Sequence, residues 1–194
     1  MKALKMIGIV VGAIVLLLAV YIMAFVPVKG HVEKSVVINA PASAVFAHLN
    51  DLKKFVVWSP WSKMDPEAKN SYEGAEAGVG AKMNWDGKDM GKGSQWIEES
   101  VENERVKTGL SFDGMEGTPS AEFKLTPEGD GTKVTWTYDG DNKGFMGKAF
   151  WMVMGGMLEG QYESGLQDLK KLVESSPIEA PTATTTPTDS TATK

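Results

Sequence analysis

Residues 132–173, TKVTWTYDGDNKGFMGKAFWMVMGGMLEGQYESGLQDLKKLV, decide the fold because the spacing of their apolar residues changes part-way. From Thr132 to Asp139 every second residue is apolar, which predicts a strand with one buried face. From Phe145 to Val173 apolar residues recur every three or four positions, which predicts a long helix. The residues in that period are Phe150, Met154, Leu158, Tyr162, Leu166, Leu169 and Val173. The stretch therefore predicts a strand followed by a long helix that closes the domain.

The preceding sequence predicts more strands and one short helix. Alternation from His31 to Ile38 predicts a first strand, and Ala42 to Leu49 predicts a short helix. Further candidate strands lie around 71–73, 81–86, 93–101, 104–113 and 120–126. Turn residues such as Glu102-Asn103 separate them, which is typical of antiparallel neighbours. The fold class expected is α+β, with one antiparallel sheet and one long C-terminal helix in a domain of residues 29–176.

An uncharged apolar run occupies residues 6–26, MIGIVVGAIVLLLAVYIMAFV. It is long enough to cross about 30 Å of hydrocarbon as a helix, so we expect residues 1–28 to form a single-pass membrane anchor. A cleaved signal peptide is the alternative. Lys2 and Lys5 precede the run, and we expect a cytoplasmic N-terminus, with the domain on the periplasmic side of the cell (inner) membrane.

The C-terminal residues 177–194, PIEAPTATTTPTDSTATK, are rich in Thr, Pro and Ala. They hold too little apolar side chain to offset the entropy of ordering, so we expect this tail to be disordered.

Composition excludes several classes of function. The formal net charge is −5 and no basic block is present, so the surface repels phosphate backbones and nucleic acid is not an expected partner. Cysteine is absent, which excludes disulfides, thiolate catalysis and zinc sites with Cys ligands.

Two glycine-rich loops resemble ion-binding motifs but fail in detail. Residues 87–94, GKDMGKGS, are one residue short of a phosphate-binding loop. Residues 139–150 resemble a calcium loop, but Phe150 stands where the final carboxylate is needed. His31 and His48 lie in different elements and are interpreted as structural. We expect neither a metal ion nor a cofactor.

Four strings carry a resemblance to a known family: Val37–Trp61 (VINAPASAVFAHLNDLKKFVVWSPW), Gly78–Gly87 (GVGAKMNWDG), Thr132–Asn142 (TKVTWTYDGDN) and Glu163–Glu174 (ESGLQDLKKLVE). Together with the order of elements, they make the chain similar to the START-like (SRPBCC) superfamily, in its polyketide cyclase/dehydrase branch. The resemblance implies a helix-grip fold, with a curved sheet of about seven strands wrapped around the C-terminal helix. It also implies an apolar cavity between sheet and helix, which in different branches holds lipids, sterols, quinones or polyketides. The superfamily has no common catalytic motif.

The cavity expected from this resemblance has a candidate lining. Alternation places apolar residues of several strands on one face of the sheet, opposite the helix, and methionines with adjacent Gly155 and Gly156 leave room for a ligand. The candidate ligand-binding residues are Met83, Trp85, Phe112, Phe123, Trp136, Tyr138, Met154, Met157, Leu158 and Tyr162, with Leu125 on the same face. Trp58 and Trp61 flank Pro60 in an expected loop, and are assigned to the cavity mouth or, as the alternative, to the core.

Three functions remain open at this level. The first is a membrane-anchored protein that binds a hydrophobic small molecule or lipid without covalent chemistry. The second is a cyclase- or dehydratase-type enzyme in which Tyr138, Tyr162 or an inward acid transfers protons. The third is an envelope interaction module with a vestigial pocket. Catalysis needs a perturbed titratable group at the cavity, and the sequence does not identify one.

Overall fold

The structure is a computed structural model that describes residues 2–115 and 117–176. The tail expected to be disordered lies outside the described residues. The elements are α1 (Lys2–Phe25), β1 (Lys29–Ile38), α2 (Ala42–Leu49), α3 (Leu52–Trp58), α4 (Pro60–Met64), β2 (Lys69–Gly74), β3 (Ala81–Asp86), β4 (Lys92–Val101), β5 (Arg105–Phe112), β6 (Ser120–Glu128), β7 (Gly131–Asp141) and α5 (Gly144–Ser175).

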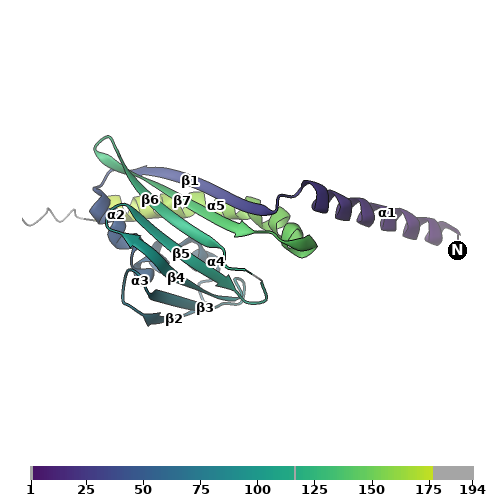
Figure 1. Ribbon diagram of the computed structural model, residues 1–194, viewed down its shortest axis with the longest axis horizontal. Helices are drawn as coiled ribbons and strands as arrows, with labels where there is room; N and C mark the ends of the chain where they lie inside the picture. The colour runs from purple at the N-terminus through teal and green to yellow at the C-terminus, as the bar shows by residue number, and fades with distance from the viewer. Residues whose placement is uncertain (1, 116, 177–194) are drawn as a thin grey trace, which may run out of the picture.

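The seven strands form one antiparallel sheet in the order β1-β7-β6-β5-β4-β3-β2 (Figure 1). Strands β2 to β7 follow one another as hairpins, and β1 joins the free edge of β7 along its whole length, from Lys29 opposite Asp141 to Ile38 opposite Thr132. Trp96 of β4 is half-buried on the outer face, because its neighbours Gln95 and Ile97 are the inward residues. The predicted α+β helix-grip fold is confirmed.

Helix α5 lies along β1 and β7 and buries one stripe of its surface (Figure 1). The fully buried stripe comprises Tyr162, Gly165, Leu166, Leu169 and Val173, which share one face of a helix. At Gly165 the backbone of α5 comes close to α4 and to the sheet, because a Cβ there would lie 2.8 Å from Cδ of Pro60 and 3.0 Å from the Trp136 ring. Its glycine is therefore explained by close packing.

The two tryptophans of the WSPW segment have different environments, and Trp58 is not at a cavity mouth. Its side chain is only 2% exposed, and its ring packs edge-on against Phe55, Phe123 and Trp136. Its Nε1 donates a hydrogen bond to the main-chain carbonyl of His48 at 3.3 Å. The core alternative is correct for Trp58, because α3 turns this ring toward the sheet. Trp61 is half-buried and packs against the edge of the core.

The expected loop after Trp58 is mostly helical. Only Ser59 leaves the helical conformation, with φ −57° and ψ 132°, and Pro60 then begins α4. Proline fits the first turn of a helix because the missing N–H has no partner there in any case. The Ser-Pro pair thus breaks one helix and starts the next.

Helix α1 extends away from the sheet and meets the rest of the protein only at its C-terminal end (Figure 1). Residues Ala3–Phe25 are long and apolar enough to cross a membrane. Ile22 and Val26 are buried at the joint, whereas most other apolar side chains of the helix are exposed. The Nζ of Lys148 in α5 donates to the carbonyl of Met23 at 2.7 Å, so α1 is attached to the first turns of α5.

Candidate functional site

The site that the family resemblance points to is the line where β7 faces α5. We name it the aromatic seam and define it as Trp136, Tyr138, Trp151, Leu158 and Tyr162. Trp136 stacks on Tyr162 with ring centroids 3.7 Å apart, and Tyr138 stacks on Trp151 at 5.7 Å. The two strand residues are two positions apart and so face the same side, while the helix residues recur at seven and four positions along one stripe.

Burial changes along the seam. Trp136 and Tyr162 are each 2% exposed and join the central core, whereas Tyr138, Trp151 and Leu158 are half-buried. The half-buried part is the end nearest α1, because α5 begins there (Figure 1). The seam is therefore tightly packed at one end and more open at the end beside the apolar helix.

Gly30 of β1 allows Trp151 to lie close to the sheet. A Cβ at residue 30 would lie 2.7 Å from the Trp151 ring, closer than real Cβ contacts allow. The indole consequently covers the backbone of β1 on one side and stacks on Tyr138 on the other. Trp151 was absent from the residues predicted to line the cavity, and Gly30 is the feature that fixes its direction.

The seam contains one buried polar atom without a partner and two tyrosine hydroxyl groups with a raised pKa. Nε1 of Trp136 is buried and has no hydrogen-bond acceptor among the described residues. Burial raises the pKa of Tyr162 well above its usual value, and nearby Tyr138 and Asp139 raise it further. Burial also raises the pKa of Tyr138, again with a contribution from Asp139. Both phenols are therefore protonated at neutral pH and available as hydrogen-bond donors.

The predicted lining residues divide into separate groups. Trp136, Tyr138, Leu158 and Tyr162 belong to the seam, whereas Phe123 lies deeper in the core, where it packs against both Trp58 and Trp136. Leu125, on the same strand as Phe123, is buried in the same core.

Three more predicted residues lie on the inner face of the sheet but away from α5. Met83 and Trp85 are on β3 and Phe112 is on β5, with the Trp85 and Phe112 rings 5.7 Å apart. They do not reach the seam because α5 covers β1 and β7. The sequence showed which face these residues occupy but not which part of it the helix covers.

The first half of α5 is rotated relative to the sequence-based expectation. Met157 is 37% exposed, and a Cβ on Gly156 would meet no atom within 4 Å. Phe150 is also exposed, whereas Met154 is half-buried. The expectation that Gly156 and Met157 face a ligand space is wrong, because Trp151 rather than Phe150 occupies the inner stripe.

The two most prominent hollows in the described part of the chain lie away from the space between the sheet and α5. They are a shallow one of about 450 Å³ along Ala19, Val20, Met23 and Ala24 of α1, and one of about 180 Å³ between α3 and the β2–β3 hairpin. The space between sheet and α5 is filled by aromatic side chains. A ligand at the seam must therefore displace them.

The loop that resembles a phosphate-binding motif is occupied by the protein's own carboxylate. Buried Asp65 accepts hydrogen bonds from the main-chain N–H groups of Asp89 at 2.8 Å and Met90 at 3.2 Å through Oδ2. Gly87 leaves room for this carboxylate, since any side chain there would overlap it. The glycine and the main-chain N–H groups of this loop thus bind a carboxylate of the protein itself.

The two histidines do not form a site with other ligands. His31 forms an exposed pair with Asp139, with 2.8 Å between Nδ1 and Oδ1. Burial lowers the pKa of His48, as does Lys54, while Asp51 opposes the shift. Among residues 2–115 and 117–176, no three His, Asp or Glu side chains gather as a metal site would require.

Comparison with known proteins agrees with this geometry. The family model described as polyketide cyclase / dehydrase and lipid transport matches residues 29–174. The chain belongs to this family. The match covers the sheet and α5 and leaves out α1, so the apolar helix lies outside the part that the polyketide cyclase/dehydrase family shares. Among the curated proteins compared, none matches the chain significantly.

Solved structures with the same fold come from several bacteria. Protein CV1439 from Chromobacterium violaceum is 20% identical, with a TM-score of 0.57, and the match covers 76% of this chain and 99% of that one. Protein MLL2253 from Mesorhizobium loti is 16% identical, with a TM-score of 0.56 and coverage of 76% and 99%. BH1534 from Bacillus halodurans is 18% identical, with a TM-score of 0.56 and coverage of 74% and 96%. At these identities the likeness shows the fold alone.

Proposed function

We propose that this family member is a membrane-anchored binding protein for a hydrophobic small molecule or lipid, held between the sheet and the first half of α5. The observation that carries the proposal is the change of burial along the aromatic seam. Tyr138, Trp151 and Leu158 are apolar or aromatic, half-buried, and lie at the end nearest α1. Opening the seam there leaves the central core intact, because that core is formed by the fully buried half of α5.

The anchor is supported by α1. Its apolar length matches a bilayer, and its side chains are exposed except at the joint with α5. An exposed helix of this composition is unstable in water and stable in hydrocarbon. We place the N-terminus in the cytoplasm and the domain outside the inner membrane, on the basis of Lys2 and Lys5 at the N-terminal end of the helix.

Binding fits the chemistry of the seam better than catalysis does. Its two titratable side chains are Tyr138 and Tyr162, and the raised pKa of each keeps the phenol protonated. A protonated phenol donates a hydrogen bond but is not a base at neutral pH. Asp139 follows Tyr138 but faces the other side of the strand, where it pairs with exposed His31. A ligand with an apolar body and a carbonyl or hydroxyl oxygen matches these donors and the free Nε1 of Trp136.

Photo-crosslinking of the full chain in lipid nanodiscs tests the proposal. The probe is a fatty acid that carries a photoactivatable diazirine, and labelled peptides are identified by mass spectrometry. We expect labels within residues 136–162. Leu158→Trp, which fills the open end of the seam, should abolish this labelling, whereas Leu172→Trp in the second half of α5 should retain it.

Two outcomes would contradict the proposal. Labels confined to residues 2–25 would show lipid around the anchor without uptake by the domain, as expected for an interaction module. Labels at Met83, Trp85 and Phe112 would place the ligand under β3 to β5 and away from α5.

A further inference from the structure

The outward side of the first half of α5 is apolar and has no partner in the structure. We name it the outer apolar face. Met146 is 76% exposed and Val153 is 70% exposed, although Met and Val side chains are usually buried in a protein interior. The face comprises Phe145, Met146, Phe150, Met152, Val153 and Met157, which are all exposed.

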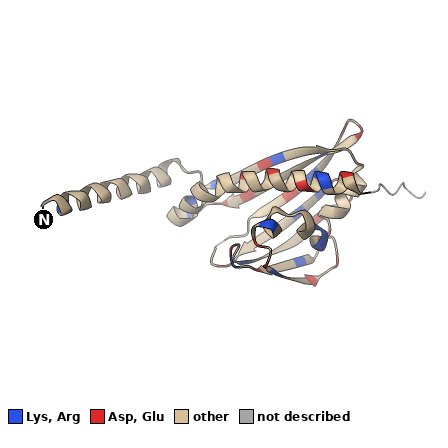
Figure 2. Ribbon diagram, turned by 180° about the vertical axis from the view of Figure 1, so that it is seen from behind, with Lys and Arg blue, Asp and Glu red and all other residues tan. Residues whose placement is uncertain are grey.

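The outward side of the second half of the same helix is charged. Its exposed residues include Glu163, Lys171 and Glu174, and the first exposed charge after the helix start is Glu159. Figure 2 shows the same division, with charged residues gathered toward the C-terminal half of α5 and almost none along α1. One helix therefore has a water-compatible exposed surface over one half and an apolar surface over the other.

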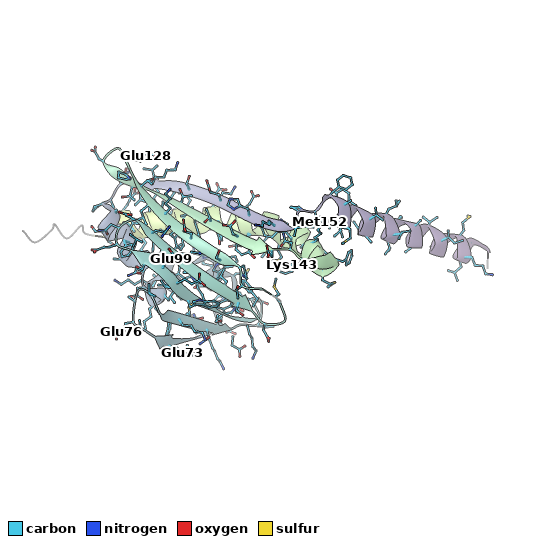
Figure 3. The ribbon with its side chains drawn as sticks, in the orientation of Figure 1. Glu73, Glu76, Glu99, Glu128, Lys143 and Met152 are labelled. Atoms are coloured by element: carbon cyan, nitrogen blue, oxygen red, sulfur yellow. The ribbon has the colours of Figure 1, made fainter. Side chains whose placement is uncertain are left out.

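The apolar half lies beside the end of α1. Lys148 reaches the carbonyl of Met23, which is inside the apolar span Ala3–Phe25. The first turns of α5 are consequently level with the last turns of the span. Met152 and Lys143 lie at this end of the domain, whereas Glu128 lies at the opposite end (Figure 3).

Lys148 is the one charged side chain of α5 between Gly144 and Leu158, and it points away from the outer apolar face. It is 8% exposed and is used at the joint with α1. A surface that binds an acidic or basic protein would present charge, and this one presents none. An uncharged apolar strip continuous with a membrane-spanning helix fits the boundary between headgroups and acyl chains.

We infer that the outer apolar face inserts into the bilayer that α1 spans, as a second membrane contact of the domain. This inference rests on the proposed membrane anchor. The contact fixes the orientation of the domain, and it sets the half-buried end of the aromatic seam at the lipid surface. A hydrophobic ligand can then pass from the bilayer to Tyr138 and Trp151 without crossing water.

The chain has no cysteine, so single cysteines report local environment in the full-length protein. We would place a nitroxide label at Val153→Cys, with Leu17→Cys in α1 and Lys171→Cys in the charged half of α5 as controls. Each variant is reconstituted in vesicles of phosphatidylcholine and phosphatidylglycerol. Collision with oxygen reports contact with lipid, and collision with a water-soluble nickel complex reports contact with water.

The expected result is that the label at Val153 matches the one at Leu17, with high accessibility to oxygen and low accessibility to nickel, while the label at Lys171 shows the reverse. Water accessibility at Val153 together with lipid accessibility at Leu17 would overturn the inference and leave the anchor intact. Water accessibility at Leu17 would remove the anchor, and the inference with it. Protection of Val153 from both reagents, with disulfide-linked dimers of the unlabelled variant, would show that a second copy covers the face and would also overturn it.

Discussion

The ammonium group of Lys148 donates a hydrogen bond of 2.7 Å to the main-chain carbonyl of Met23. That carbonyl belongs to the last turn of α1, where backbone acceptors have no partner within the helix. A cation also interacts favourably with the partial negative charge at a helix C-terminus. The buried ammonium group of Lys148 thus has a hydrogen-bond partner at the joint between the two helices, and this bond holds α1 against the domain.

The first prediction concerns this joint. Lys148→Met keeps the length of the side chain but removes the donor, at a cost of about 1.5–3 kcal/mol for a charged hydrogen bond. We expect the angle between α1 and the domain to become variable. Electron paramagnetic resonance distances between labels at Leu16→Cys and Glu33→Cys should broaden in this variant. Lys143→Met, which removes an exposed partner of Asp141, is the control and should not broaden them. An unchanged distribution in Lys148→Met would mean that Ile22 and Val26 hold the joint alone.

The second prediction uses two glycines of α5. Gly165→Ala places a methyl group 2.8 Å from Pro60, so α4 or α5 must shift, at a cost of about 1–3 kcal/mol. Gly160→Ala meets no atom within 4 Å and should stabilise the helix by up to about 1 kcal/mol. Urea unfolding of the protein in detergent should therefore shift in opposite directions. Equal stabilisation by both variants would show that α5 does not approach α4 as closely as the structure shows.

The third prediction concerns the carboxylate of Asp65, which follows α4 and accepts hydrogen bonds from the β3–β4 loop. Asp65→Ala leaves the N–H groups of Asp89 and Met90 without their acceptor, which should lower the free energy of unfolding by about 2 kcal/mol. Hydrogen exchange at these two amides should become faster. Asp86→Ala, which removes an exposed partner of Lys92, should leave both amides protected. Retained protection in Asp65→Ala would assign those donors to another acceptor.

The fourth prediction follows from the raised pKa of Tyr162. An unfolded tyrosine loses its proton near pH 10, whereas the folded protein retains it to higher pH because the phenol is buried. Between these two values the unfolded chain binds fewer protons, so stability falls as pH rises above about 10. Tyr162→Phe should make this fall shallower, measured as the free energy of unfolding against pH. Tyr72→Phe should change it less, because Tyr72 is 40% exposed. Identical slopes for wild type and Tyr162→Phe would contradict the burial of this hydroxyl.

The sequence was sufficient where one side of an element is polar. Alternation along β7 correctly separated inward Val134 and Trp136 from outward Thr135 and Thr137. The charged residues of the second half of α5 likewise left one stripe for the core, and Tyr162, Leu166 and Leu169 lie on it. In these segments only one orientation of the strand or helix keeps its polar side in water, so the pattern alone determines which residues are buried.

The candidate site could be predicted only in part, because the first half of α5 is apolar on nearly every side and its single charged residue, Lys148, is buried. A period of three or four residues has no preferred phase in FWMVMGGML, and Phe150 was assigned to the inner stripe that Trp151 occupies. The choice is made by Gly30, which has no side chain to exclude the indole, and by Tyr138, on which that indole stacks. Gly30 lies on the first strand and Tyr138 on the strand before the helix, so the apolar pattern of the helix contains neither residue.

The sequence by itself thus determined the strands, the long helix and the apolar N-terminal helix, since each follows from how its own residues divide between water and an apolar environment. Only the tertiary structure decided that Trp58 fills the core, that Asp65 occupies the glycine loop, and that the apolar half of α5 presents one side to the sheet and the other outward. Those outcomes depend on which distant group has the complementary shape or the free hydrogen-bond donor. Such complementarity exists only once the chain has brought the two groups together.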